Sequence, residues 1–164
     1  MTCTLILMRH AKSSWSDPGQ PDHLRPLNKR GKRAARALGD WLRGHGHIPD
    51  QILCSSAARA QLTCQGLELG LPAPAVPALY HAEPGAMLQV LQKATGRCVL
   101  MIGHNPGIAD FARQIVAQAP RNDRFADYPT GATLVATFDV PGWGQATWKS
   151  GTAVDFIVPR ALTD

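Results

Sequence analysis

The chain has 164 residues, of which 45% are hydrophobic and 18% charged, so it is long and apolar enough to bury one core. We expect a single domain over residues 1–164. No run approaches the roughly 20 apolar residues that a membrane span needs, and the start lacks the basic region of a signal peptide. These exclusions predict a cytoplasmic protein without a membrane partner.

The net charge of +5 suits an anionic partner, either a phosphorylated ligand or nucleic acid. Seven of the seventeen basic residues fall between Arg25 and Arg43, where Asp40 is the one acid. No interleaved aromatic residues of the kind that stack on bases accompany this run. We therefore predict a solvated helix face there and no nucleic-acid partner.

The first third of the chain predicts a strand, a loop and a helix. Residues 4–8 form an unbroken apolar run, which is typical of a strand buried on both faces. Residues 18–26 are too rich in proline for regular structure and predict a surface loop. Asn28 is suited to cap the next helix, which ends around residues 44–46. The apolar side chains of this helix recur at helical spacing.

The middle of the chain repeats the pattern of strand and helix. Residues 52–54 predict a second strand, and either Ser55 or Ser56 can cap the helix that follows. The further elements expected are a helix at 57–69, a strand at 76–80, a helix at 86–93 and a strand at 98–102.

The last third begins with a helix and ends with a hairpin. Asn105 is expected to cap a helix that starts at Pro106 and runs to about residue 118. Residues 133–138 and 147–158 predict strands joined by a turn at 141–144. Strands that alternate with helices indicate an α/β fold, a three-layer α/β/α sandwich with a mostly parallel central sheet.

Ligands of such sheets bind beyond the carboxyl ends of the strands, so residues that follow different strands are expected to meet there. Arg9 and His10 follow the first predicted strand, Ser55 to Arg59 follow the second, and His104 follows the fourth. Taken singly, each residue has a simpler explanation: a chance Arg-His pair, a surface arginine, or a turn histidine. Their joint position at strand ends favours a site.

Two histidines and two arginines at one sheet edge suit the chemistry of phosphate. The guanidinium forks of Arg9 and Arg59 can each donate paired hydrogen bonds to phosphoryl oxygens. A neutral imidazole can attack phosphorus, and His10 is the candidate nucleophile because a rigid strand fixes its position. His104 near a helix start would add a further donor.

Four motifs follow one another along the chain: Met8-Arg9-His10-Ala11, Arg25-Pro26-Leu27 with Gly31, Ser55-Ser56-Ala57-Ala58-Arg59-Ala60-Gln61-Leu62-Thr63, and Gly103-His104-Asn105-Pro106. Together they resemble the histidine phosphatase superfamily, and most closely its SixA branch of phosphohistidine phosphatases. The resemblance implies a phosphoglycerate mutase-like fold, His10 as the phosphorylated residue and a phosphate pocket of Arg9, Arg59 and His104. Ala11 replaces the glycine usual in the wider superfamily, and the chain lacks the long lid insertion of larger members.

Further site residues are less determined by the pattern. Glu83 either protonates the leaving group or is an exposed glutamate near a helix start. Lys12 and Ser13 after the nucleophile, and Asn105 after His104, are expected to bind substrate.

We expect no cofactor and no metal. His45 and His47 lie close together in the sequence, but they lack further ligands nearby and are expected to belong to a solvated helix end.

The expected activity is that of a metal-independent phosphoric monoester or phosphoramidate hydrolase. The expected partner is a substrate protein that carries phosphohistidine. One alternative is that the substrates are small phosphorylated metabolites. Another is that the protein is a non-catalytic module that binds phosphate or a phosphoprotein.

Overall fold

A six-stranded sheet forms the middle layer of the protein, whose computed structural model describes residues 1–163. The strands are β1 (Cys3–Arg9), β2 (Gln51–Ser55), β3 (Ala75–Val76), β4 (Cys98–Gly103), β5 (Thr133–Phe138) and β6 (Thr152–Ile157). The helices are α1 (Lys29–Gly44), α2 (Ala58–Leu67), α3 (Pro84–Gln92), α4 (Gly107–Ile115) and α5 (Arg160–Thr163), with short 3₁₀ helices η1 (Asp22–Leu24), η2 (Pro77–Leu79) and η3 (Trp143–Gln145).

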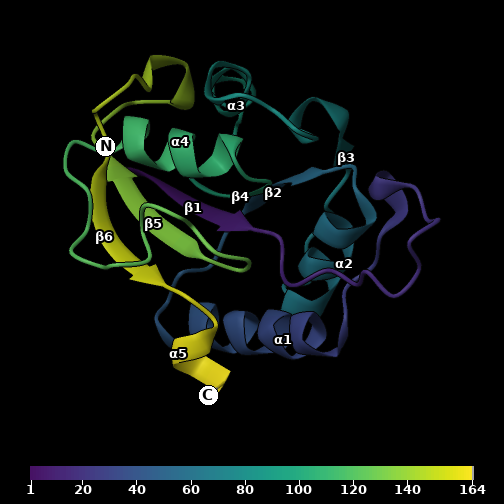
Figure 1. The fold of residues 1–164 in the computed structure, drawn as a ribbon. Helices are drawn as coiled ribbons and strands as arrows, with labels where there is room; N and C mark the ends of the chain where they lie inside the picture. Colours follow the sequence, from purple (N-terminus) through teal and green to yellow (C-terminus); the bar gives the residue numbers. More distant parts are fainter. Residues whose placement is uncertain (164) are drawn as a thin grey trace.

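The strand order is β3-β2-β4-β1-β5-β6, which places β1 inside the sheet. The pairs β2 with β3, β2 with β4 and β1 with β4 are parallel, whereas β5 runs antiparallel to both β1 and β6. Helices α3 and α4 cover one face, and α1, α2 and α5 cover the other (Figure 1). The predicted three-layer sandwich with a mostly parallel sheet is confirmed.

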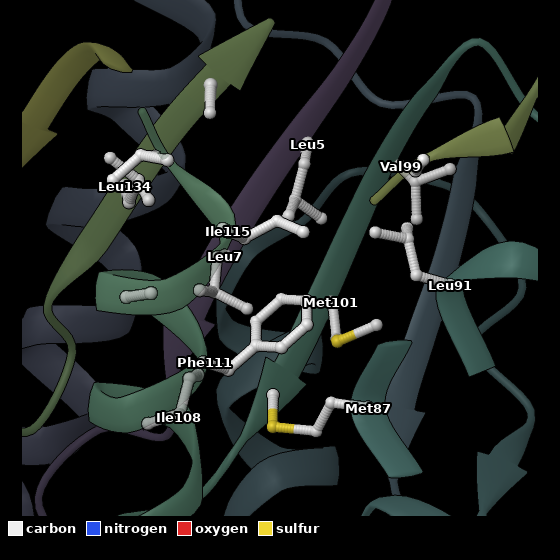
Figure 2. Packing of buried hydrophobic residues seen from close by; sticks show 14 of the residues in the cluster. Leu5, Leu7, Met87, Leu91, Val99, Met101, Ile108, Phe111, Ile115 and Leu134 are labelled. Atoms are coloured by element: carbon white, nitrogen blue, oxygen red, sulfur yellow. The ribbon is translucent and has the colours of Figure 1, made fainter. Parts of the chain in front are cut away.

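Strand β1 serves both hydrophobic layers because successive side chains of a strand point to opposite faces. Leu5 and Leu7 belong to the cluster with α3 and α4, and Ile6 and Met8 belong to the cluster with α1 and α2. Figure 2 shows the first cluster, in which Phe111 of α4 is fully buried. Each such side chain contributes about 1.5–3 kcal/mol by leaving water, so β1 is fixed from both sides.

Helix α1 forms where the sequence predicts it, with Asn28 as its cap. The Asn28 side-chain oxygen accepts a hydrogen bond from the Gly31 N–H at 2.8 Å. Leu38 and Leu42 are fully buried, whereas Arg30, Lys32 and other basic residues are exposed.

None of the helices within residues 1–163 combines the length and the apolar character needed to cross a membrane.

Two predicted strands are shorter than expected. The strand expected at 76–80 ends at Val76, because Pro77 begins a 3₁₀ helix and a proline has no N–H to donate to a strand partner. The strand expected at 147–158 extends only over 152–157, since residues 147–150 close a turn in which the Ser150 hydroxyl bonds the Thr147 carbonyl at 2.6 Å.

The predicted serine cap of α2 is wrong, whereas the Asn105 side-chain oxygen accepts the Ala109 N–H in the first turn of α4 at 3.2 Å. Ala57 precedes α2 without a side-chain cap, and the Ser55 hydroxyl instead bonds His104. Helix α4 starts at Gly107 rather than at Pro106, after a cis peptide bond between Asn105 and Pro106. It ends at Ile115, short of residue 118, because Val116 is extended and pairs with Gly151.

Gly31 gives a test of how α1 holds the segment after β1. A Cβ at this position would overlap the carbonyl oxygen of Lys12, whereas a Cβ at Gly44 in the same helix meets nothing within 4 Å. We expect Gly31→Ala to lower the free energy of unfolding by about 2 kcal/mol, since backbone atoms must move. Gly44→Ala is expected to be neutral or stabilising by about 0.5 kcal/mol. Urea denaturation compares the two, and equal effects would contradict the proposed packing.

Candidate active site

His10 lies immediately after β1 and is held by backbone groups. Its N–H donates to the Gly103 carbonyl at 3.1 Å, which joins it to the end of β4. The ring Nδ1–H donates to the Ala11 carbonyl at 2.7 Å, so in the neutral ring Nε2 carries the lone pair. Arg59 Nε lies 3.4 Å from that Nε2 atom and donates toward it. The ring is therefore oriented with its nucleophilic nitrogen facing a guanidinium.

Burial keeps the His10 imidazole neutral. His10 is only 5% exposed. This burial lowers the pKa of its ring to about 4, and the Arg9 and Arg59 charges act in the same direction. The Ala11 carbonyl opposes the shift without cancelling it. At neutral pH the ring is unprotonated, which is the form that can attack phosphorus.

His104 lies beside His10 at the end of the neighbouring strand, with the two ring centroids 5.1 Å apart. Its Nε2 atom is 2.7 Å from the Ser55 hydroxyl, which also accepts the Ala57 N–H at 3.3 Å. The hydroxyl can therefore donate to Nε2, which places the ring proton on Nδ1. Nδ1 is buried without a hydrogen-bond partner among the described residues. Burial, followed by the electrostatic effects of His10 and Arg59, lowers the pKa of His104 to about 3.

Arg59, in the first turn of α2, is held by Asp22 from the loop after β1. Nη1 of Arg59 donates to the Asp22 carbonyl at 2.8 Å, and Nη2 lies 3.1 Å from Asp22 Oδ2. The Tyr80 hydroxyl donates to the same carboxylate oxygen at 2.5 Å, and His81 Nε2 lies 3.3 Å from it. These contacts, that from Tyr80 foremost, lower the pKa of Asp22 to about 2, so the carboxylate is ionised at neutral pH.

Helix α2 is tied directly to the segment that carries the nucleophile. The Thr63 hydroxyl accepts the Ala11 N–H at 2.9 Å and donates to the Arg59 carbonyl at 2.7 Å. Thr63 is fully buried, so no solvent competes for either bond. The relative position of His10 and Arg59 is thereby fixed through one hydroxyl group.

Arg9 completes a strongly cationic setting. Its Nη1 donates to the Tyr128 carbonyl at 3.2 Å, but Nε is buried without a partner among residues 1–163. Burial, and then the Arg59 charge, lowers the pKa of the Arg9 guanidinium. Buried donors without partners cost free energy, and an oxyanion is the ligand that would satisfy both Arg9 Nε and His104 Nδ1.

The structure thus brings His10, Arg59 and His104 together, with Arg9 close enough to influence His10. Glu83 is exposed at the start of α3 and, within the described chain, has no hydrogen bond or ion pair with the three. It lines a recess together with His81 and with Asn105, the residue after His104, so its role as proton donor stays a prediction.

The other predicted substrate ligands lie around the site rather than in it. Lys12 is exposed, and Ser13 is buried through its backbone pairing with Leu27. Both amide hydrogens of Asn105 are used, at 2.9 Å to the Asp127 carbonyl and 3.1 Å to the Tyr128 carbonyl. Asn105 therefore holds a loop and has no free donor for phosphate.

The two histidines considered as metal ligands have other partners. His47 Nε2 lies 3.1 Å from Asp155, and His45 Nδ1 donates to the Trp41 carbonyl at 3.0 Å. Across residues 1–163 no three His, Cys, Asp or Glu side chains are grouped so that they could hold a metal ion.

Sequence reasoning missed Asp22, Tyr80 and His81. Asp22 lies in the proline-rich loop, where an acidic residue carries no positional signal. The loop is shaped by Arg25, a residue of the Arg-Pro-Leu motif: its guanidinium stacks 3.9 Å from the centre of the Trp15 ring and donates to the Asp17 carbonyl at 3.1 Å. The Arg-Pro-Leu motif was the sequence signal that could have indicated an ordered loop around Asp22.

The lowered pKa of His10 predicts a pH dependence of stability. Unfolded His10 binds a proton as the pH falls below about 6.5, whereas folded His10 does so only near 4. Stability is therefore complete above about 6.5 and decreases as the pH falls toward 4. In His10→Asn the slope of the unfolding free energy between these values should fall by up to about 1.4 kcal/mol per pH unit. Chemical denaturation at a series of pH values measures this, and an unchanged slope would show that His10 is not buried neutral.

Comparison with known proteins agrees with this geometry. Residues 5–89 match the sequence profile of the histidine phosphatase superfamily (branch 1). An uncharacterised protein of Mycobacterium tuberculosis is 33% identical over 161 residues, covering 93% of this chain and 100% of that protein.

Two solved structures, both of candidate SixA phosphohistidine phosphatases, are similar over nearly the whole chain. The protein from Nakamurella multipartitia has a TM-score of 0.86 at 27% identity, covering 97% of each chain. The protein from Agrobacterium tumefaciens has a TM-score of 0.78 at 25% identity, covering 96% of this chain and 98% of that one. The profile match spans just over half of the chain and includes His10, Arg59 and Glu83. The chain belongs to the histidine phosphatase superfamily.

Proposed function

We propose that the protein is a phosphatase that forms a phosphohistidine intermediate on His10 and removes phosphate from phosphohistidine in a protein substrate. The observation that carries this proposal is the His10 ring itself: Nδ1 donates to the Ala11 carbonyl at 2.7 Å, and Nε2 faces Arg59 at 3.4 Å. A buried neutral imidazole in this orientation is a nucleophile prepared for attack on an anion held by the neighbouring arginines.

In the first step Nε2 of His10 attacks phosphorus. A new P–N bond forms on His10 as the bond from phosphorus to the substrate nitrogen or oxygen breaks, and the leaving group takes a proton from Glu83 or from water. Arg9 and Arg59 stabilise the charge on the phosphoryl oxygens, and His104 donates through its unpaired Nδ1. Asp22, which occupies the Arg59 fork in the free protein, keeps that guanidinium in place.

In the second step water attacks phosphorus and the P–N bond to His10 breaks. The products are inorganic phosphate and the neutral imidazole, so His10 is regenerated. Each of the two displacements has a lower barrier than a single direct hydrolysis, and the same cationic groups serve both.

A phosphohistidine substrate is supported by the names of the two similar solved proteins and by the exposure of Glu83, the predicted proton donor. An imidazole leaves phosphorus with little help once it is protonated, so a solvent-exposed acid suits it. Alkoxide leaving groups of phosphate esters need a proton donor, and Asp22 is a poor one because its pKa is about 2. Small phosphorylated metabolites are therefore the secondary substrate class. The cytoplasmic location remains a prediction.

Replacing the nucleophile tests the mechanism. We expect His10→Ala to lose at least about 10⁴-fold in kcat and to take up no label from ³²P-labelled substrate, because no covalent intermediate can form. His45→Ala, an exposed histidine at the end of α1, is the matched control and should keep full activity. Turnover of His10→Ala close to that of the wild type would disprove the intermediate.

Replacing Glu83 distinguishes the two substrate classes. With Glu83→Gln, hydrolysis of a phosphohistidine protein should change by less than about threefold, whereas hydrolysis of a phosphate ester should fall by about tenfold or more if Glu83 supplies the proton. The comparison uses kcat for both substrates on one enzyme preparation. A phosphohistidine rate that falls as far as the ester rate would mean that Glu83 serves the main reaction.

A further inference from the structure

A cavity of about 460 Å³ opens on the surface beside the segment that carries His10. We call it the basic groove. Helix α1, the segment after β1, the loop before β5 and the C-terminal segment supply its walls. Its cationic lining residues are Arg9, Lys12, Arg30, Arg33, Arg124 and Arg160.

The groove has an excess of positive charge. Among the described residues of the lining, Asp127 is the acid, and it is already paired with Arg124 at 3.1 Å. Lys12, Arg30 and Arg33 are exposed and have no ion-pair partner within residues 1–163. Like charges gathered on one surface repel one another, and a ligand that carries several negative charges would relieve this repulsion.

The rest of the lining favours a protein over a nucleic acid. Ala34, Pro129, Val158 and Pro159 provide apolar surface between the cationic side chains. Among the described residues that line the groove, none is aromatic, so bases would find no ring on which to stack. Carboxylates with intervening apolar side chains match both parts of this surface.

The basic groove adjoins the segment that carries the nucleophile. Arg9 lines the groove and directly precedes His10, and Lys12, two residues after His10, lines it as well. A chain that presents a phosphorylated side chain to His10 can therefore place its neighbouring residues in the groove.

We propose that the basic groove binds an acidic segment of the phosphoprotein substrate, with carboxylates close to the phosphorylated histidine. The inference rests on the proposed function and adds to it the chemistry by which the substrate is chosen. The groove contributes affinity and discrimination, whereas the pocket around His10 performs the phosphoryl transfer.

The test uses two synthetic phosphohistidine peptides that differ only in whether glutamate or glutamine flanks the phosphorylated residue. The enzyme is compared with Arg30→Glu/Arg33→Glu in the groove. Lys32→Glu/Arg36→Glu is the control, since it makes the same charge change on exposed residues of α1 that do not line the groove. Fluorescence anisotropy gives the Kd of each peptide, and phosphate release from phosphoimidazole reports the chemical step.

We expect the wild type and the control to bind the glutamate peptide about tenfold more tightly than the glutamine peptide, with a preference that weakens as salt is added. The groove variant should lose this preference and keep hydrolysis of phosphoimidazole. Equal affinities for both peptides, an equal loss in the control, or tighter binding of a single-stranded oligonucleotide than of the glutamate peptide would overturn the groove proposal. Absence of phosphoimidazole hydrolysis by the wild type would instead overturn the proposed function.

Discussion

The parallel pairing of β1 with β4 is the constraint on which the site depends. Its register places Arg9 opposite Gly103, so His10 and His104 follow the two strands side by side. The pairing is fixed because β1 is packed from both faces, and a slip by one residue would move each of its buried side chains to the wrong layer. The same packing that stabilises the sheet therefore determines the distance between the two imidazoles.

Burial is the main reason why both imidazoles stay neutral. It lowers the pKa of His10 to about 4 and that of His104 to about 3, and the neighbouring guanidinium charges act in the same direction. Asp22 offsets part of the charge of Arg59. The result is a setting that is cationic for an arriving anion and still holds an unprotonated nucleophile.

Much of this arrangement could be predicted from the sequence. The apolar run of β1 and the rule that ligands bind at carboxyl ends of strands place His10 and His104 together, and the motif of α2 adds Arg59. Asp22 could not be found, because its contacts with Arg59 and Tyr80 span 37 and 58 residues and depend on how an irregular loop folds. The role of Glu83 stays a prediction, because this glutamate is exposed at the start of α3 and bonds none of the other site residues within the described chain.

The contact between Asp22 and Arg59 has a consequence for how the centre adapts. His10, His104 and Ser55 lie at the ends of strands and belong to the rigid framework, whereas Asp22 comes from a surface loop held largely by side chains such as Arg25. The two imidazoles therefore depend on the sheet for their positions, whereas the Arg59 guanidinium depends on a loop. A substitution in that loop would reorient Arg59 and leave the two histidines where the strands place them.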